Sequence, residues 1–249
     1  MLLLHGSRQG SVDFAEESGF TRAADAEGFV VAAPRQETRH QFGRFWRWYD
    51  SGHQQRDLGE PALLVGIVTE VLGPDTDFRI DRRRVYAAGL SAGGAMALIL
   101  AANYPDMFAA AGVHSATAYR SATQSFRALA AMAARGRAPR GATGEMAPVV
   151  LIHGTGDQVV RPTNADRIVD QWLTSRDEGG GWRRVRTLAR TRSFVVDGRR
   201  CIRTRWYSIP CAVDGSSNTG GSTASRTPGR AAEPRGPTST RTGRRRPRS

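Results

Sequence analysis

Short apolar runs alternate with helix-like segments along the first 173 residues, and this alternation limits the chain to few folds. The apolar runs are at residues 1–4, 28–34, 85–88, 108–113 and 148–152. The segments predicted to be helical are at residues 12–26, 61–71, 92–103 and 164–173. Strands that alternate with helices form a mostly parallel sheet with helices on both faces. The sequence therefore predicts an α/β domain, in which ligands bind beyond the carboxyl ends of the strands.

The chain of 249 residues has the length of one domain with a tail. We assign residues 1–197 to the α/β domain, since a domain near this size buries a core without metals or disulfides. Residues 198–249 are assigned to a basic tail rich in Gly, Ser, Pro and Arg. From residue 214 onward large apolar residues are almost absent, so we expect this part to be disordered or an out-of-frame translation of a GC-rich gene.

The formal net charge of +13 is concentrated in the tail. Residues 201–249 hold ten Arg against two acids, whereas residues 1–200 hold 26 Arg against 21 acids. The predicted domain is thus only mildly basic, and no specific nucleic acid is expected to bind it. The run of three arginines at residues 244–246 leaves one alternative, in which the tail binds nucleic acid or another anionic surface.

The remaining composition argues against several other classes of protein. The run at residues 1–4 is too short for the core of a signal peptide, and no apolar run is long enough to span a membrane. No cluster has the spacing of metal ligands and no loop is built to hold phosphate, so neither a metal nor a cofactor is predicted. The two cysteines, Cys201 and Cys211, do not fix the redox compartment.

A Gly-Leu-Ser-Ala-Gly motif at residues 89–93 follows one apolar run and precedes a helix rich in alanine. This is the layout of a nucleophile elbow, in which a strand delivers Ser91 to a sharp turn. Gly89 and Gly93 remove side chains where strand and helix crowd each other. Ala92 begins the helix, so its N–H can donate to a developing oxyanion. The context predicts a nucleophile at Ser91, against the alternative of an ordinary Gly/Ser turn.

Further candidate residues lie just after other predicted strands. Asp157 follows the run at residues 148–152, where a carboxylate can orient a histidine and stabilise its charged form. The alternative for Asp157 is a surface turn or a helix cap. Ser7 follows the first run and a His-Gly pair, so its N–H is the candidate for the second oxyanion donor. The alternative for Ser7 is a plain β-turn.

An aromatic segment at residues 45–49 contains Trp46 and Trp48. These two side chains are predicted to form a wall of a substrate cleft. The alternative is that they pack a long loop onto the domain, and the sequence favours neither interpretation.

The histidines raise a difficulty for a serine hydrolase. The chain has five, namely His5, His40, His53, His114 and His153, and none follows residue 153. In hydrolases with this type of elbow the histidine comes after the acid in chain order. The expected base is therefore missing or displaced. His114 and His153 follow predicted strands and are candidates for a substitute base, although histidines in such places are more often structural.

Several segments together resemble one known family, the polyhydroxybutyrate depolymerase-like esterases, which are α/β-hydrolases related to feruloyl and acetylxylan esterases. The resemblance covers roughly residues 2–175. It rests on Gly-Leu-Ser-Ala-Gly-Gly-Ala-Met with Ser91 after Arg84-Val85-Tyr86, Leu4-His5-Gly6, Trp46-Arg47-Trp48, Gly59-Glu60, Val113-His114-Ser115 and His153-Gly154-x-x-Asp157. It implies serine-dependent hydrolysis of small or polymeric carboxylic esters, and usually secretion to the extracellular space.

The resemblance also assigns roles to residues. It implies that Ser91 is the nucleophile, that Asp157 is the triad acid, and that Ser7 and Ala92 offer the oxyanion N–H groups. The chain departs from the family pattern at both ends, because it starts at the His-Gly segment and lacks the Gly-His-Ala-Trp segment that carries the triad histidine. We therefore expect an α/β-hydrolase fold without its N-terminal strands and its C-terminal strand–helix unit. The alternative function is a catalytically inactive or truncated hydrolase relic.

Overall fold

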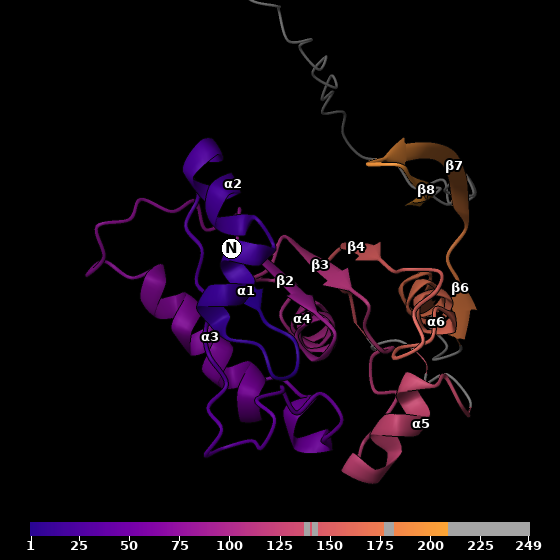
Figure 1. The fold of residues 1–249 in the computed structure, drawn as a ribbon, viewed down its shortest axis with the longest axis horizontal. Coiled ribbons are helices and arrows are strands. Elements are labelled where there is room, and N and C mark those ends of the chain that lie inside the picture. The colour runs from indigo at the N-terminus through magenta and orange to yellow at the C-terminus, as the bar shows by residue number, and fades with distance from the viewer. Residues whose placement is uncertain (137–139, 141–143, 177–181, 209–249) are drawn as a thin grey trace, which may run out of the picture. The chain divides into compact units, whose positions relative to one another are not determined.

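A computed structural model describes residues 1–136, 140, 144–176 and 182–208. The chain divides into two units, Met1–Pro210 and Cys211–Ser249, and only the first contains described residues. Within the first unit a parallel sheet carries most of the fold, and two small antiparallel sheets follow it along the chain (Figure 1).

The main sheet is parallel throughout, with the order β1-β2-β3-β4. Its strands are β1 (Leu2–Leu4), β2 (Tyr86–Leu90), β3 (Ala110–His114) and β4 (Val149–Ile152). Leu90 lies opposite His114, which in turn lies opposite Ile152. The carboxyl ends of these strands therefore line up along one edge of the sheet. This arrangement confirms the predicted α/β architecture.

The helices are α1 (Ser11–Glu17), α2 (Phe20–Glu27), α3 (Gly59–Val71), α4 (Ala92–Asn103), α5 (Ala128–Met132) and α6 (Thr163–Trp172), with short 3-10 helices η1 (Ser51–His53) and η2 (Ser125–Arg127). The single helix predicted over residues 12–26 is two helices. Gly19 separates them, because its φ of 77° is left-handed and ends the first helix. The strand predicted over residues 28–34 is reduced to a parallel bridge between Ala32 and Leu2, since Pro34 soon ends the extended stretch.

Helices cover both faces of the sheet, and successive residues of β1 show this. Leu2 and Leu4 join the core that contains α4, whereas Leu3 packs with Phe14 of α1 on the other face. Nearly all of α4 is buried, as expected for a helix that is apolar on every side. The Gly-Leu-Ser-Ala-Gly motif thus ends in the first turn of a deeply buried helix.

β4 is the last strand of this sheet among the described residues, and one of its faces is open. Val150 is 63% exposed and Ile152 is 54% exposed. Strands of parallel sheets are ordinarily covered on both faces. The described part of the chain therefore leaves apolar side chains uncovered at this end of the sheet.

Two antiparallel pairs follow α6. They are β5 (Thr174–Arg176) with β6 (Trp182–Arg184), and β7 (Thr187–Val196) with β8 (Arg199–Ser208). The predicted boundary between domain and tail, at 197/198, falls at the turn between β7 and β8. Asp197 and Gly198 have φ values of 48° and 73°, as the two central residues of a type I′ hairpin turn require. Residues 199–208 form the strand β8, because local turn chemistry outweighs the composition, and the boundary of the domain stays a prediction. The rest of the predicted tail, 209–249, lies outside the described residues.

No helix in the described ranges combines the length and the apolar character needed to cross a membrane.

Candidate active site

Ser91 lies at the turn between β2 and α4 with φ 55° and ψ −115°. Such a positive φ is costly for a residue with a side chain, and strained residues of this kind cluster at functional sites. Two backbone hydrogen bonds hold the turn. The Ser91 N–H donates to the His114 carbonyl at 2.9 Å, and the Ser91 carbonyl accepts from the Ala95 N–H at 2.9 Å. The backbone of Ser91 is the one that a nucleophile elbow requires.

The glycines of the motif are sterically necessary. A Cβ atom on Gly89 would lie 2.4 Å from the carbonyl group of Gly93. A Cβ atom on Gly93 would lie 2.1 Å from the Leu4 carbonyl oxygen and 2.6 Å from the His5 carbonyl oxygen. The elbow therefore presses directly against the end of β1, where the predicted oxyanion segment begins.

The two predicted oxyanion donors border this elbow. Ala92 is the first residue of α4, and Ser7 lies in the exposed segment after β1. Among the described residues neither backbone N–H has a hydrogen-bond partner. The segment that carries Ser7 reaches the elbow, since a Cβ atom on Gly6 would lie 3.4 Å from the Leu90 carbonyl oxygen. Both N–H groups thus lack an acceptor among the described residues, as the prediction of oxyanion donors requires.

His5 fixes the peptide between Gly6 and Ser7. The Gln36 N–H donates to His5 Nε2 at 3.1 Å, so the ring proton is on Nδ1, which donates to the Gly6 carbonyl at 2.7 Å. Burial lowers the pKa of His5 and keeps its ring neutral. Because a trans peptide is planar, a fixed Gly6 carbonyl also fixes the direction of the Ser7 N–H. A role for His5 and Gln36 could not be predicted from the sequence, since their contact joins residues far apart in the chain.

Asp157 lies just past β4, at the same edge of the sheet. Its Oδ1 accepts the N–H groups of Val159 and Val160 at 2.9 Å each, and its Oδ2 is 3.5 Å from Nε2 of His153. Partial burial acts to raise the pKa of Asp157, but hydrogen bonds from Val160, the Ser115 hydroxyl and Val159 outweigh it and hold that pKa below its usual range. The carboxylate is thus ionised and able to stabilise an imidazolium.

Two histidines lie at this edge, and in the described residues neither ring is hydrogen-bonded to the Ser91 hydroxyl. His153 has a buried side chain whose Nε2 bonds the Val160 carbonyl at 2.8 Å, while its Nδ1 has no partner among the described residues. His114 ends β3 with a partly exposed ring, and partial burial together with nearby His153 lowers its pKa. Within the described ranges no hydrogen bond joins the Ser91 hydroxyl to a histidine.

Trp46 and Trp48 are core residues, 4% and 7% exposed. The indole N–H of Trp46 donates to the His5 carbonyl at 3.1 Å, and its ring stands 5.4 Å from the His5 ring. Neither side chain offers a substrate more than a trace of surface. Their burial fits the packing alternative, and a role in substrate binding stays a prediction.

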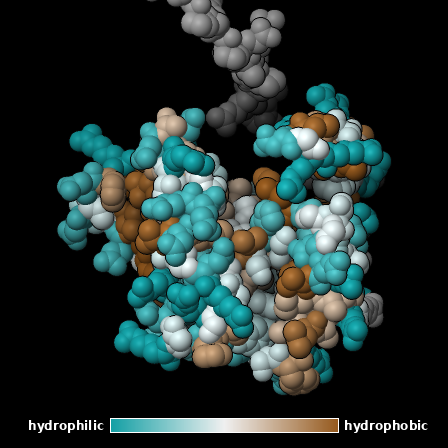
Figure 2. Space-filling view, viewed as in Figure 1, coloured by the Kyte–Doolittle hydropathy of each residue, from teal (hydrophilic) through white to brown (hydrophobic). Residues whose placement is uncertain are grey.

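Unlike Trp46 and Trp48, two apolar side chains on η2 and α5 are exposed. Neither of these two elements was predicted from the sequence. Phe126 is 73% exposed and Leu129 is 77% exposed, and Figure 2 shows apolar surface gathered over α5. The C-terminal end of α5 lies beside the Asp157 segment, because the Met132 carbonyl accepts the N–H of Arg161 at 2.9 Å. Helix α5 therefore approaches the segment that follows Asp157 in the chain.

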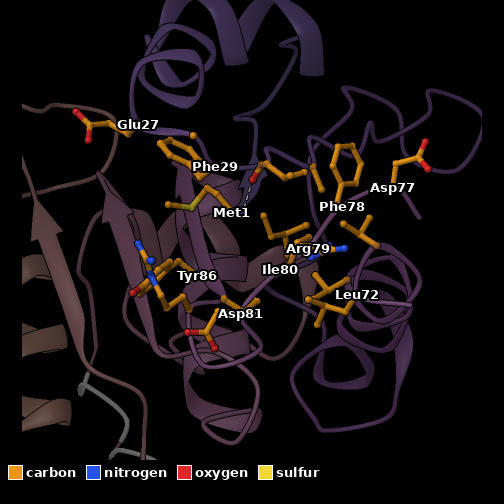
Figure 3. Close-up of a pocket in the computed structure, with 18 residues that line it drawn as sticks. Met1, Glu27, Phe29, Leu72, Asp77, Phe78, Arg79, Ile80, Asp81 and Tyr86 are labelled. Atoms are coloured by element: carbon orange, nitrogen blue, oxygen red, sulfur yellow. Dashed lines mark hydrogen bonds between the residues drawn. The ribbon is translucent and has the colours of Figure 1, made fainter. Parts of the chain in front are cut away.

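A separate pocket of about 650 Å³ lies at the opposite end of the strands (Figure 3). Its labelled apolar lining includes Met1 before β1 and Tyr86 at the start of β2, together with Phe29 and Phe78. None of the predicted site residues lines it, so it is not part of the candidate active site.

The lowered pKa of Asp157 has a consequence for stability. The folded protein stabilises the ionised form of Asp157 more than the unfolded chain does. This stabilisation is present above the unfolded pKa of about 4 and is lost as pH falls through the lowered folded value. Asp157→Asn is therefore expected to lower the free energy of unfolding by about 1 kcal/mol near neutral pH and by less near pH ~3. Urea unfolding at both pH values measures this, with Asp25→Asn on the surface of α2 as the control. If Asp157→Asn lowers the free energy of unfolding by the same amount at both pH values, the prediction is contradicted.

Comparison with known proteins places the site in a wider context. The family described as "Esterase PHB depolymerase" matches residues 1–190. Poly(3-hydroxyalkanoate) depolymerase C of Paucimonas lemoignei is 30% identical over 184 residues, which are 69% of this chain and 44% of that protein. Feruloyl esterase B of Thermothelomyces thermophilus is 31% identical over 167 residues, 60% of this chain and 55% of that protein. The chain thus spans about half, or less, of the length of these relatives.

A solved structure supports the fold. Acetyl xylan esterase from Aspergillus awamori superposes with a TM-score of 0.59 at 19% identity, covering 69% of this chain and 67% of that one. This likeness shows that the two chains share the α/β-hydrolase fold.

Proposed function

The chain belongs to the family of PHB depolymerase esterases, and from this premise we propose that it is a serine hydrolase of carboxylic esters. The observation that carries the proposal is the backbone of Ser91. Ser91 has a positive φ, and it lies at a turn so tightly packed that position 93 has no room for a side chain. A strained, tightly packed turn of this kind is retained where a nucleophile must be presented.

The reaction is acyl transfer to water. The Ser91 hydroxyl oxygen attacks the ester carbonyl carbon, and the N–H groups of Ser7 and Ala92 stabilise the resulting oxyanion. The tetrahedral intermediate collapses, releases the alcohol and leaves an acyl group on Ser91. Water then attacks the acyl group and releases the carboxylic acid. A base takes the proton of Ser91 and returns it to the leaving alkoxide, and Asp157 stabilises the positive charge on that base.

Proton transfer from Ser91 is the slow step of the proposed reaction. No histidine follows His153 in the sequence, and among the described residues neither the His114 ring nor the His153 ring is hydrogen-bonded to the Ser91 hydroxyl. A positioned general base contributes about 10²- to 10⁴-fold to such reactions. We therefore propose a low rate, carried by the oxyanion hole and the nucleophile. The same observation favours the second candidate, an inactive hydrolase scaffold.

The ester substrate is proposed to have an apolar part. Phe126 of η2 and Leu129 of α5 present exposed apolar side chains, on which an acyl chain or a polymer strand can lie. Both small and polymeric esters fit this surface. An extracellular location follows from the family resemblance and stays part of the proposal.

Hydrolysis of p-nitrophenyl acetate by the wild-type protein and by Ser91→Ala tests the function. We expect a rate above that of buffer in the wild type and a loss of that rate in Ser91→Ala. Ser18→Ala, at the end of α1, is the matched control and should keep the rate. Equal rates in buffer, wild type and Ser91→Ala, from protein shown to be folded, would mean an inactive scaffold.

A further inference from the structure

Glu60 is a buried carboxylate whose two oxygens hold two different segments of the chain. It lies in the first turn of α3 and is 7% exposed. Its Oε1 accepts the side-chain amide of Gln36, and its Oε2 accepts the Arg47 N–H at 2.7 Å. Burial raises the pKa of Glu60. Burying a carboxylate is costly unless hydrogen bonds satisfy it, so a buried and hydrogen-bonded carboxylate indicates a specific role.

The two segments held by Glu60 meet at His5. The backbone N–H of Gln36 donates to Nε2 of the His5 ring at 3.1 Å. The residue before Arg47 is Trp46, and its indole donates to the His5 carbonyl at 3.1 Å. One carboxylate therefore ties together the partner of the His5 ring and the partner of the His5 carbonyl.

His5 in turn contacts the peptide that carries the candidate oxyanion donor. With Nε2 accepting from Gln36, the ring proton is on Nδ1 and donates to the Gly6 carbonyl at 2.7 Å. That carbonyl belongs to the same planar peptide as the Ser7 N–H. A ring that lost its partner at Nε2 could adopt the other tautomer and release the peptide.

We propose that Glu60 is a positioning residue for the oxyanion hole. It touches no substrate, and it acts through Gln36 and His5 on the direction of the Ser7 N–H. The effect on the reaction rate rests on the proposed esterase function. The effect on the His5 ring and on the Gly6–Ser7 peptide does not.

Glu60→Gln tests the proposal with almost no change in shape. The new amide keeps an oxygen for the Arg47 N–H, but its NH₂ group then faces the NH₂ group of Gln36, so the Gln36 side chain must turn over or move away. Losing one oxyanion donor costs about 10²- to 10³-fold in kcat, and we expect a partial loss of about tenfold, with KM nearly unchanged. Asp106→Asn is the matched control, because it alters an exposed carboxylate that pairs with Arg56 at 2.6 Å on the surface.

A swapped double variant provides the rescue. When Gln36→Glu is combined with Glu60→Gln, the amide at position 60 donates to the carboxylate at position 36. Its oxygen remains for the Arg47 N–H. Both hydrogen bonds are restored, and the only difference is that position 60 now donates and position 36 accepts. We therefore expect kcat to recover. A residue that only stabilises the fold would change stability without this paired effect on kcat.

Nuclear magnetic resonance reads the geometry without any turnover. In the wild type the ¹⁵N signals of His5 are expected to show a proton on Nδ1 and none on Nε2. The ¹³C signal of the Gly6 carbonyl reports its hydrogen bond. In Glu60→Gln both sets of signals should shift, in the double variant they should return, and in Asp106→Asn they should not move.

The outcomes separate the proposal from the esterase function. Unchanged His5 and Gly6 signals in Glu60→Gln would overturn the proposal, as would shifted signals with an unchanged kcat. A wild-type rate equal to that of Ser91→Ala would refute the esterase function alone, and the signals would then decide the role of Glu60 by themselves. If Glu60→Gln does not fold, Gln36→Met is measured in the same way, since it removes the side-chain link and keeps the backbone N–H.

Discussion

Gly93→Ala is expected to lower the free energy of unfolding by about 3 kcal/mol and to abolish any ester hydrolysis. The added methyl group would lie 2.1 Å from one backbone carbonyl oxygen and 2.6 Å from the next, at Leu4 and His5. Backbone at the end of a buried strand cannot move as a flexible side chain can. Either α4 must leave the sheet or the end of β1 must shift, and both changes separate Ser91 from Ser7. Urea unfolding followed by fluorescence of the buried Trp46 and Trp48 measures the loss.

Gly66→Ala is the control for this experiment. Gly66 lies inside α3, and a Cβ atom there would meet nothing within 4 Å. The same substitution is therefore expected to stabilise the protein by about 0.5 to 1 kcal/mol, because alanine favours a helix. A Gly93→Ala variant as stable as the wild type would refute the packing described for the elbow.

Free imidazole is expected to raise the ester hydrolysis rate of the wild-type protein by about tenfold or more. Ser91 and Asp157 lie at the same edge of the sheet, and no described histidine is bonded to the Ser91 hydroxyl. A base supplied from solution can take the serine proton while the Asp157 carboxylate stabilises its charge. The measurement is the rate against imidazole concentration, after subtraction of the hydrolysis that imidazole causes without protein.

Two variants show whether the added base works at the proposed site. Ser91→Ala should abolish the increase, and Asp157→Asn should reduce it. His114→Ala tests the substitute base, since a loss of basal rate that imidazole restores would assign the proton transfer to His114. A rate that rises equally in wild type and Ser91→Ala would show that imidazole acts without the nucleophile.

The features predicted well from the sequence are those set by neighbouring residues. The turn at Ser91 follows from an apolar strand, two glycines and a helix, all within a few positions. The predicted helix over residues 92–103 matches α4 for the same reason. The alternation of strands and helices likewise predicts a parallel sheet, because each element carries its own pattern.

The features that were missed depend on distant residues or on competing signals. The contacts among His5, Gln36 and Glu60 join segments that only the folded chain brings together. The composition of residues 45–49 is the same whether their aromatic rings are buried or line a cleft, so the burial of Trp46 and Trp48 could not be predicted from it. The β7–β8 hairpin carried a usable signal in its Asp197-Gly198 turn, but the many arginines nearby favoured a tail.

The uncovered face of β4 bears on how the protein behaves in concentrated solution. Val149 to Ile152 form an uncharged apolar run with Pro148 before it, and two of its side chains are more than half exposed. Short segments with high β-propensity and no charge are the ones that recruit other chains when they lie at a sheet edge. Pro148 protects one end of the run. The described part of the domain thus carries an aggregation hazard at β4, the outer strand of the sheet that leads to Asp157.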